Sequence, residues 1–454
     1  MSMDRRELLA KERVGRLLWR LSVPAVIGML VQASYNIVDA IFIGRGVGPL
    51  GLAGTTIVFP IQLLASSLAV TIGVGGASII SRSLGAKKYE KANRALGNMV
   101  FLSLIFSTTI LITGSLAQQR LLRLFGASPT ILPYAEEYLQ VILMGLPFVG
   151  FGMSLNHAAR SEGNARVAMI SMIISAVMNM ILDPIFIFVL NMGIRGAAIA
   201  TVISQIAMAC WMGYYFLLSG NSFLVLALRY GQPQLEYIKE ILSVGAAEFV
   251  RMASGSMIIV FINNSLIHYG SDISVAVYGI LHRALSFSFL PIVGVSQGLQ
   301  PILGFNYGAE RYDRARDVAR LAIIAASCIA FCAFMVGMFF PEKVVRLFTT
   351  DLLLIKEASA SLRIVITAYF LVGFQITGSS MFQALGKGRA SLILSLTRQV
   401  IFFLPCVVIL PRFFLLKGIW LAFPTADALA FLVTVTLVSR QLGALKMERS
   451  EQNQ

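Results

Sequence analysis

Two acidic residues lie inside apolar stretches of the first half of the chain. Asp39 lies in the apolar run from Val38 to Ile43, and it shares a helical face with Gln32 and Asn36. Asp183 lies next to Pro184 inside another apolar run, with Asn179 one helical turn earlier on the same face. A charge at the centre of a bilayer costs about 2.5–3.5 kcal/mol on insertion scales. Both carboxylates are therefore candidates for function.

The residue types around these carboxylates suit a small cation. Carboxylate, amide and carbonyl oxygens are the ligands that hard cations prefer. Pro184 cannot donate a backbone hydrogen bond, and its ring blocks the bond to the carbonyl of Met180, which frees one more oxygen. We predict that Asp39 and Asp183 bind either a monovalent cation or protons. The alternative is a structural polar pair near a helix end.

Several side chains near these residues are expected to line a substrate cavity. The chain has 19 methionines, and several of them surround Asp183 in the sequence. Their flexible thioethers suit a cavity that adapts to different ligands, although any single one could equally face lipid or the core. The predicted cavity residues are Gln32, Tyr35, Asn36, Asn156 and Met172.

The second half of the chain carries a different set of charges. The chain contains an internal repeat, and its second copy has Ile262 and Cys406 where the first has Asp39 and Asp183, so a cation site of the same type is not expected there. A polar network of Arg283, Arg398 and Asp427 is predicted instead, in which Asp427 pairs with one of the two arginines. We interpret this pair as an ion pair that holds the second half together.

The composition defines the elements that must position these residues. Of the 454 residues, 57% are hydrophobic and only 13% are charged, whereas soluble domains are about 25% charged. This excludes a soluble enzyme, a disordered protein and a nucleic-acid-binding protein. Twelve apolar runs reach the roughly 20 residues that a spanning helix needs. The predicted fold class is therefore all-α, a polytopic membrane protein with twelve transmembrane helices.

The internal repeat groups these helices. The loop that begins at Gly85 recurs at Gly308, and Arg123-Leu124-Phe125 recurs as Arg346-Leu347-Phe348 at the same offset along the chain. Six helices per half make the repeat parallel, as in some transporters whose two halves alternate access to a central site. We predict an N-lobe over 1–218, a cytoplasmic linker over 219–237 and a C-lobe over 238–454. Glycines in the second helix of each half, such as Gly75 and Gly298, should let helices approach closely.

The basic residues predict the orientation. Most of the 37 Lys and Arg residues lie near the N-terminus and in the connections on the same side, which places both termini in the cytoplasm. The first apolar run is too long for a cleavable signal peptide, so it should remain as a span. Pro24 lies early in that run and is expected to kink the first helix.

Three stretches carry a resemblance to a known family. They are Asn36 to Gly44, Asn179 to Pro184, and Gln300 to Ala309 with the sequence QPILGFNYGA. Together they resemble the multidrug and toxic compound extrusion (MATE) family, in particular its prokaryotic DinF-like branch, over about residues 15–442. The resemblance implies a two-lobed antiporter that expels cationic amphiphilic compounds against sodium ions or protons. It also implies a cation site formed by Asp39, Asn179, Asp183 and Thr201, and a first helix that bends near Pro24.

The sequence thus predicts a secondary active multidrug efflux transporter rather than an enzyme. It would be a multi-pass monomer in the inner membrane of a prokaryote, would need no cofactor beyond the coupling ion, and would bind no nucleic acid. A lipid-linked oligosaccharide flippase of the same superfamily is the alternative, but a cationic cavity would be expected for it. Three histidines are too few for a convincing catalytic or metal cluster, and the duplicated lobes disfavour a pore.

Overall fold

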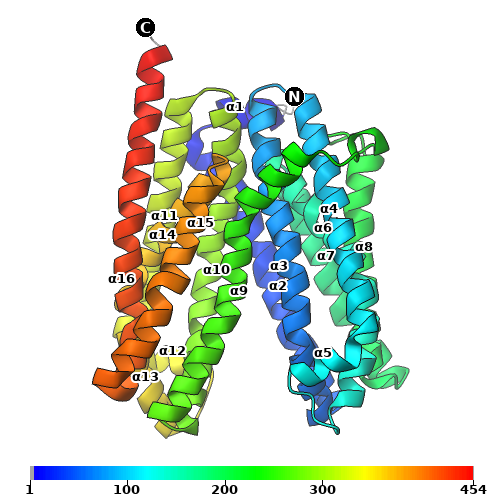
Figure 1. Cartoon of the computed structure of the whole chain (residues 1–454), viewed down its shortest axis with the longest axis vertical. Coiled ribbons are helices and arrows are strands. Elements are labelled where there is room, and N and C mark those ends of the chain that lie inside the picture. Colours follow the sequence, from blue (N-terminus) through cyan, green and yellow to red (C-terminus); the bar gives the residue numbers. More distant parts are fainter. Residues whose placement is uncertain (1–4, 453–454) are drawn as a thin grey trace. The chain divides into compact units, whose positions relative to one another are not determined.

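The computed structural model describes residues 5–452, and every regular element among them is helical. Residues 1–4 and 453–454, at the outer ends of the two expected lobes, lie outside the described part. The elements of the first half are α1 (Arg5–Lys11), α2 (Val14–Gly46), α3 (Pro49–Gly85), α4 (Tyr89–Leu116), α5 (Gln118–Leu124), α6 (Leu132–Ser161), α7 (Ala165–Pro184), the π-helical turn η1 (Ile185–Val189) and α8 (Gly193–Leu217) (Figure 1).

The second half begins with a short 3-10 turn and ends with a long helical segment. Its elements are η2 (Leu228–Tyr230), α9 (Leu235–Tyr269), α10 (Asp272–Gly308), α11 (Tyr312–Phe339), α12 (Pro341–Arg346), α13 (Leu352–Ile366), the 3-10 turn η3 (Tyr369–Leu371), α14 (Val372–Ala384), α15 (Gly388–Leu396), the π-helix η4 (Thr397–Phe403) and α16 (Leu404–Gln452).

The internal repeat is visible in the helix boundaries. α10 begins and ends at the positions that match the start and end of α3 at the offset of the sequence repeat, and the same holds for α11 and α4. The turns between helices repeat as well, because Gly163 and Gly386 both adopt a left-handed conformation, with φ of 84° and 74°. Glycine tolerates this conformation at a helix end without the strain that a side chain would add. The two halves therefore share one backbone plan.

The helices account for twelve spans. Ten helical stretches of the described chain are long and apolar enough to cross a membrane. α13 joins η3 and α14 through a 46° bend as an eleventh, broken span. The longest stretch, Gly388–Glu448, contains a break at Leu415, where φ is 50° and ψ is −135°. This break divides the stretch into the last two spans.

The chain packs as two compact units, and two long helices run from one unit into the other. Ile27–Gly245 belong to the first unit, whereas Glu7–Val26 and the chain from Ala246 onward belong to the second. α2 thus begins in the second unit and ends in the first, and α9 does the reverse. The expected lobes differ from these units over residues 7–26 and 238–245. The repeat shows where a helix begins and ends, but it does not show which neighbours each end contacts.

The expected linker is packed as part of the first unit. Glu162, at the end of α6, is fully buried and accepts hydrogen bonds from the Tyr215 hydroxyl, the Ser222 hydroxyl and the backbone N–H of Phe223. Further along, Asn98 of α4 accepts a hydrogen bond from the backbone N–H of Gln234 at 2.9 Å. These bonds hold the segment between α8 and α9 against the first part of α4 and the end of α6.

Helix ends near the site are set by local signals. The side chain of Asn164 accepts a hydrogen bond from the N–H of Val167 and so caps the start of α7. α7 ends at Pro184, and the chain continues as the π-helical turn η1, as expected where proline interrupts the helical ladder. α2 continues as one helix through Pro24, and a kink there stays a prediction.

Candidate cation-binding site

Asp183, Asn179 and Thr201 form a buried group in the first unit. α7 supplies Asn179 and Asp183 one turn apart, and α8 supplies Thr201. The side-chain nitrogen of Asn179 donates to Oδ1 of Asp183 at 3.2 Å and lies 3.4 Å from the Thr201 hydroxyl oxygen. Exposure is 0% for Asp183, 1% for Asn179 and 9% for Thr201. Three of the four residues implied by the resemblance therefore lie together, away from the surface.

Asp39 joins this group from α2. Its carboxyl group interacts directly with that of Asp183. Oδ1 of Asp39 and Oδ2 of Asp183 are both buried, and neither accepts a hydrogen bond from an N–H or O–H donor in the described part of the chain. Two carboxylates in contact repel each other unless a proton or a cation lies between them. The arrangement therefore fits a site that binds one or the other.

Two further features define the chemistry of this site. Oδ1 of Asn179 is buried without a hydrogen-bond donor among the described residues, so it is a third oxygen available to a ligand. Within residues 5–452, no group of three or more His, Cys, Asp or Glu side chains could hold a metal ion. Two carboxylates and neutral oxygens suit a small hard cation better than a transition metal, which prefers imidazole or thiolate ligands.

Packing at the end of α2 holds Asp39 in place. Phe42, one turn after Asp39, packs edge-to-face on Phe188 of η1, with ring centroids 6.2 Å apart. Ile43 is 1% exposed and lies in the same core cluster as Ile187 and Ile194. Because the π-helical turn follows directly after Pro184, the interruption of α7 places Phe188 where α2 can contact it. The local break therefore helps to position both carboxylates.

Tyr138 of α6 is a neighbour of the site that the sequence did not reveal. Its side chain is 4% exposed, and its hydroxyl lies near Asp39, Tyr35 and Asp183. Tyr138 lies far from Asp39 in the sequence and on a different helix, so spacing along a single helix could not identify it. An aromatic hydroxyl inside a predicted span is the only signal that could have found it.

The predicted cavity residues occupy two places. Gln32 and Asn36 are exposed side chains on α2, and Tyr35 between them is half-buried beside Asp39. Asn156 is 5% exposed, and its amide donates to the carbonyl of Ala168 and to the Ser171 hydroxyl, both at 2.8 Å. These bonds tie α6 to α7. A role for Asn156 in a cavity wall stays a prediction.

Met172 lies closer to the start of α7 than Asn179 and Asp183 do, and it contacts α2. A methyl group placed on Gly28 would lie 2.8 Å from the Met172 sulfur, so the backbone of α2 passes close to this side chain. The sulfur also accepts a hydrogen bond from Arg160 at 3.2 Å. Met172 thus joins α2, α6 and α7 at a level away from the carboxylates, and its place in a substrate cavity also stays a prediction.

The polar network of the second unit forms with one of the two expected arginines. Nε of Arg398 donates to Oδ1 of Asp427 at 2.9 Å, and the amide of Gln375 donates to the backbone carbonyl of Asp427 at 2.7 Å. Arg283 is exposed and has no ion-pair partner in the described part of the chain. Arg398 lies in the π-helix η4. A π-helix shifts the helical register locally, and the spacing of residues in the sequence does not reveal this shift.

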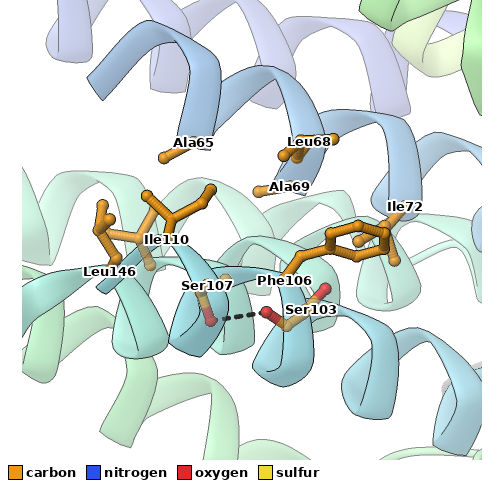
Figure 2. Close-up of a pocket in the computed structure, with 11 residues that line it drawn as sticks. Ala65, Leu68, Ala69, Ile72, Ser103, Phe106, Ser107, Ile110 and Leu146 are labelled. Carbon is orange, nitrogen blue, oxygen red and sulfur yellow. Dashed lines mark hydrogen bonds between the residues drawn. The ribbon is translucent and has the colours of Figure 1, made fainter. Parts of the chain in front are cut away.

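A crevice within the first unit is too small for a drug-sized ligand. Its walls come from α3, α4 and α6, and Figure 2 shows Ser107 turned toward Ser103, whose carbonyl accepts its hydrogen bond at 2.6 Å. The volume is about 10 Å³, which is close to the space for one water molecule. Sites for drug-sized ligands are typically about 300–1,000 Å³. This crevice is therefore not the substrate site.

The sequence pattern of the MatE family matches residues 24–185 and 246–408. This chain belongs to the MATE family. Each matched segment covers most of one repeat, in agreement with the duplicated helix boundaries. The resemblance expected from the three sequence stretches is confirmed.

Relatives and solved structures extend the match over the whole chain. A protein named multidrug export protein MepA from Staphylococcus aureus (strain MRSA252) is 28% identical over 444 residues, 97% of each chain. A protein of the same name from Staphylococcus saprophyticus is 28% identical over 443 residues. A crystal structure of MATE in the straight conformation covers 98% of this chain and 100% of its own, with a TM-score of 0.92 and 31% identity.

A second solved structure is titled the outward-facing conformation of a multidrug resistance MATE family transporter of the MOP superfamily. It has a TM-score of 0.92 and 30% identity, and covers 98% of this chain and 100% of its own. The MATE fold of this chain, with twelve helices in two halves, is thereby confirmed. The chain is a multi-pass membrane protein.

Proposed function

We propose that this MATE-family chain is a cation-coupled multidrug efflux transporter. The observation that carries the proposal is the direct interaction of the Asp39 and Asp183 carboxyl groups, with a buried oxygen on each that no donor in the described chain satisfies. Such a pair is stable only when a proton or a cation is bound. The names of the relatives support multidrug export as the transport activity.

The coupling follows from the two charge states of this pair. With a cation or proton bound, the carboxylates are neutralised and α2 and α7 can stay in contact. Once the ion leaves, repulsion between the carboxylates favours a different arrangement of the two helices. A ligand shifts such an equilibrium only by its differential affinity for the two states. Export of a cationic amphiphile against inward flow of sodium ions or protons is the direction we propose.

The remaining expectations belong to the same proposal. The transporter acts as a monomer in the plasma membrane of a prokaryote, with both termini in the cytoplasm and no cofactor besides the coupling ion. The proposed site of the first unit is acidic, and a flippase that recognises a pyrophosphate-linked lipid would need a basic site. The acidic site therefore gives no support to the flippase alternative.

Counter-transport in proteoliposomes tests the proposal. Purified protein is reconstituted, a sodium gradient and a proton gradient are imposed separately, and movement of a fluorescent cationic amphiphile is recorded. One of the two gradients should drive transport in the wild type, and Asp39→Asn should reduce it to the level of empty liposomes. Asp272→Asn is the matched control, because this carboxylate is exposed at the start of α10. Full gradient-driven transport by Asp39→Asn would contradict the proposal.

A further inference from the structure

A groove within the first unit has an excess of positive charge. It lies where α3 turns into α4 and at the start of α9, and its volume is about 560 Å³. Its walls contain four basic side chains, one acidic side chain and two tyrosines: Lys87, Lys88, Lys91, Arg94, Glu90, Tyr89 and Tyr237. None of these residues belongs to the proposed cation site.

Three lysines in this groove are available to a ligand. Arg94 forms an ion pair with Glu90 at 2.8 Å, which satisfies the one acidic group. The side-chain ammonium groups of Lys87, Lys88 and Lys91 make no hydrogen bond and no ion pair with any described residue. Lys87 and Lys88 are exposed, and Lys91 is half-buried against the wall of the groove. Three uncompensated ammonium groups so close together in the sequence attract an anion strongly.

The internal repeat provides a direct comparison, because the second unit contains the same turn. The N–H of Lys88 donates to the carbonyl of Ser83, and the N–H of Arg311 donates to the carbonyl of Asn306, each at 2.8 Å. Lys87 and Glu310 occupy the same left-handed position, with φ of 57° and 58°. The backbone of the turn is therefore the same in both copies, but its side chains carry opposite charges at this position.

In the second unit, the basic side chains after this turn bind the chain itself. Arg311 donates to the carbonyl of Ala10 at 2.8 Å, and Arg314 donates to the carbonyl of Glu12 at 2.6 Å. Their counterparts in the first copy of the repeat are Lys88 and Lys91. The two arginines thus bind carbonyl oxygens near the end of α1. The side chains of Lys88 and Lys91, at the same positions of the repeat, have no acceptor among the described residues.

The corresponding segment of the first unit is held in a different way. Asn98 accepts from the N–H of Gln234 and donates to the carbonyl of Gln232, at 2.9 and 3.3 Å. These bonds replace the ones that arginines make in the second unit. The lysines are therefore not needed to hold the chain, and they remain in an open groove.

We propose that this groove binds the phosphodiester headgroup of an anionic phospholipid. The groove lies at the start of α4, a candidate span, and exposed apolar side chains such as Leu104 and Ile105 follow along that helix. Tyrosine rings such as Tyr89 and Tyr237 are typical of the level at which headgroups meet the acyl chains. Basic pockets at the end of membrane helices are suited to anionic headgroups.

Native mass spectrometry of the full-length protein tests this inference. Delipidated protein is titrated with dioleoyl phosphatidylglycerol and, separately, with dioleoyl phosphatidylcholine. The wild type should bind phosphatidylglycerol preferentially, and the triple variant K87Q/K88Q/K91Q should bind it about tenfold more weakly or worse. The control R166Q/R320Q/R389Q removes the same charge from three exposed arginines outside the groove. It should bind like the wild type.

Each other outcome overturns the inference. Equal phosphatidylglycerol binding by the groove variant and the wild type would show that the lysines bind no lipid. Equal loss in both triple variants would show a general charge effect. Displacement of the lipid by millimolar inorganic phosphate would identify a soluble anion as the ligand. Gel filtration and thermal unfolding of each variant confirm that it is folded, and the transport assay is not needed for any of these results.

Discussion

The side-chain nitrogen of Asn179 donates a hydrogen bond to Oδ1 of Asp183 at 3.2 Å, while the other oxygen of that carboxylate is buried without a donor in the described chain. Asn179 therefore orients the carboxylate and leaves one oxygen available to a ligand. Its own amide oxygen also lacks a donor among the described residues. In the proposed site, the amide nitrogen of Asn179 thus orients Asp183, and its amide oxygen is available to the ligand.

Asn179→Leu should weaken binding of the coupling ion without abolishing the fold. The change removes one hydrogen bond to a charged group, worth about 1.5–3 kcal/mol, and one candidate ligand oxygen. We expect the ion concentration for half-maximal counter-transport to rise roughly 10- to 100-fold, with a smaller change in the maximal rate. A titration of the driving ion in proteoliposomes measures this. An unchanged half-maximal concentration would mean that Asn179 does not contribute to the site.

The ion pair of the second unit should be structural. Arg398→Met leaves Asp427, 8% exposed, without its ion-pair partner, and removal of one partner of a buried pair costs about 3–5 kcal/mol. We expect a cost near the lower limit, because the Arg398 side chain is 27% exposed. The double variant Arg398→Met with Asp427→Leu should recover most of the lost thermal stability and should transport at near wild-type rates. A double variant that is stable but inactive would instead indicate a role in transport.

Gly75→Ala should disrupt the packing of α3 on the first part of α9. A methyl group at Gly75 would lie 2.7 Å from the backbone carbonyl carbon of Ile241, and a backbone cannot move as a flexible side chain can. Overpacking of this kind costs about 1–3 kcal/mol, occasionally more. Gly44→Ala is the matched control in α2, because nothing lies within 4 Å of the added methyl group. Thermal unfolding in detergent should show a clear loss for the first variant and little change for the second.

The sequence was sufficient to predict the spans and the repeat, and it singled out the two carboxyl groups that the structure brings together. Hydrophobic run length reports directly on membrane spans, and the one-turn spacing of Asn179 and Asp183 within α7 is a local property. The helix boundaries recur at the offset of the sequence repeat because the two copies have similar sequences. These features all depend on residues that are close in sequence or related by the repeat.

Features that depend on packing between distant segments could not be predicted. The choice of Arg398 over Arg283 as the partner of Asp427 depends on how η4 packs against α16. Tyr138 reaches the proposed site from α6, and no spacing rule connects it with Asp39. For the same reason, the sequence did not predict that α2 and α9 are each divided between the two units.

Glu162 should determine how firmly the segment between α8 and α9 is held. Glu162→Ala removes the acceptor of the Ser222 hydroxyl and of the Phe223 N–H, both bonded at 2.9 Å, and of the Tyr215 hydroxyl. Leaving a buried donor unsatisfied costs about 1–3 kcal/mol, so the loss should be large enough to lower the Tm clearly. Glu162→Gln keeps an acceptor oxygen and should lose much less. Faster hydrogen exchange at Phe223 in the alanine variant alone would locate the effect, whereas equal exchange in all three proteins would show that Glu162 does not hold this segment.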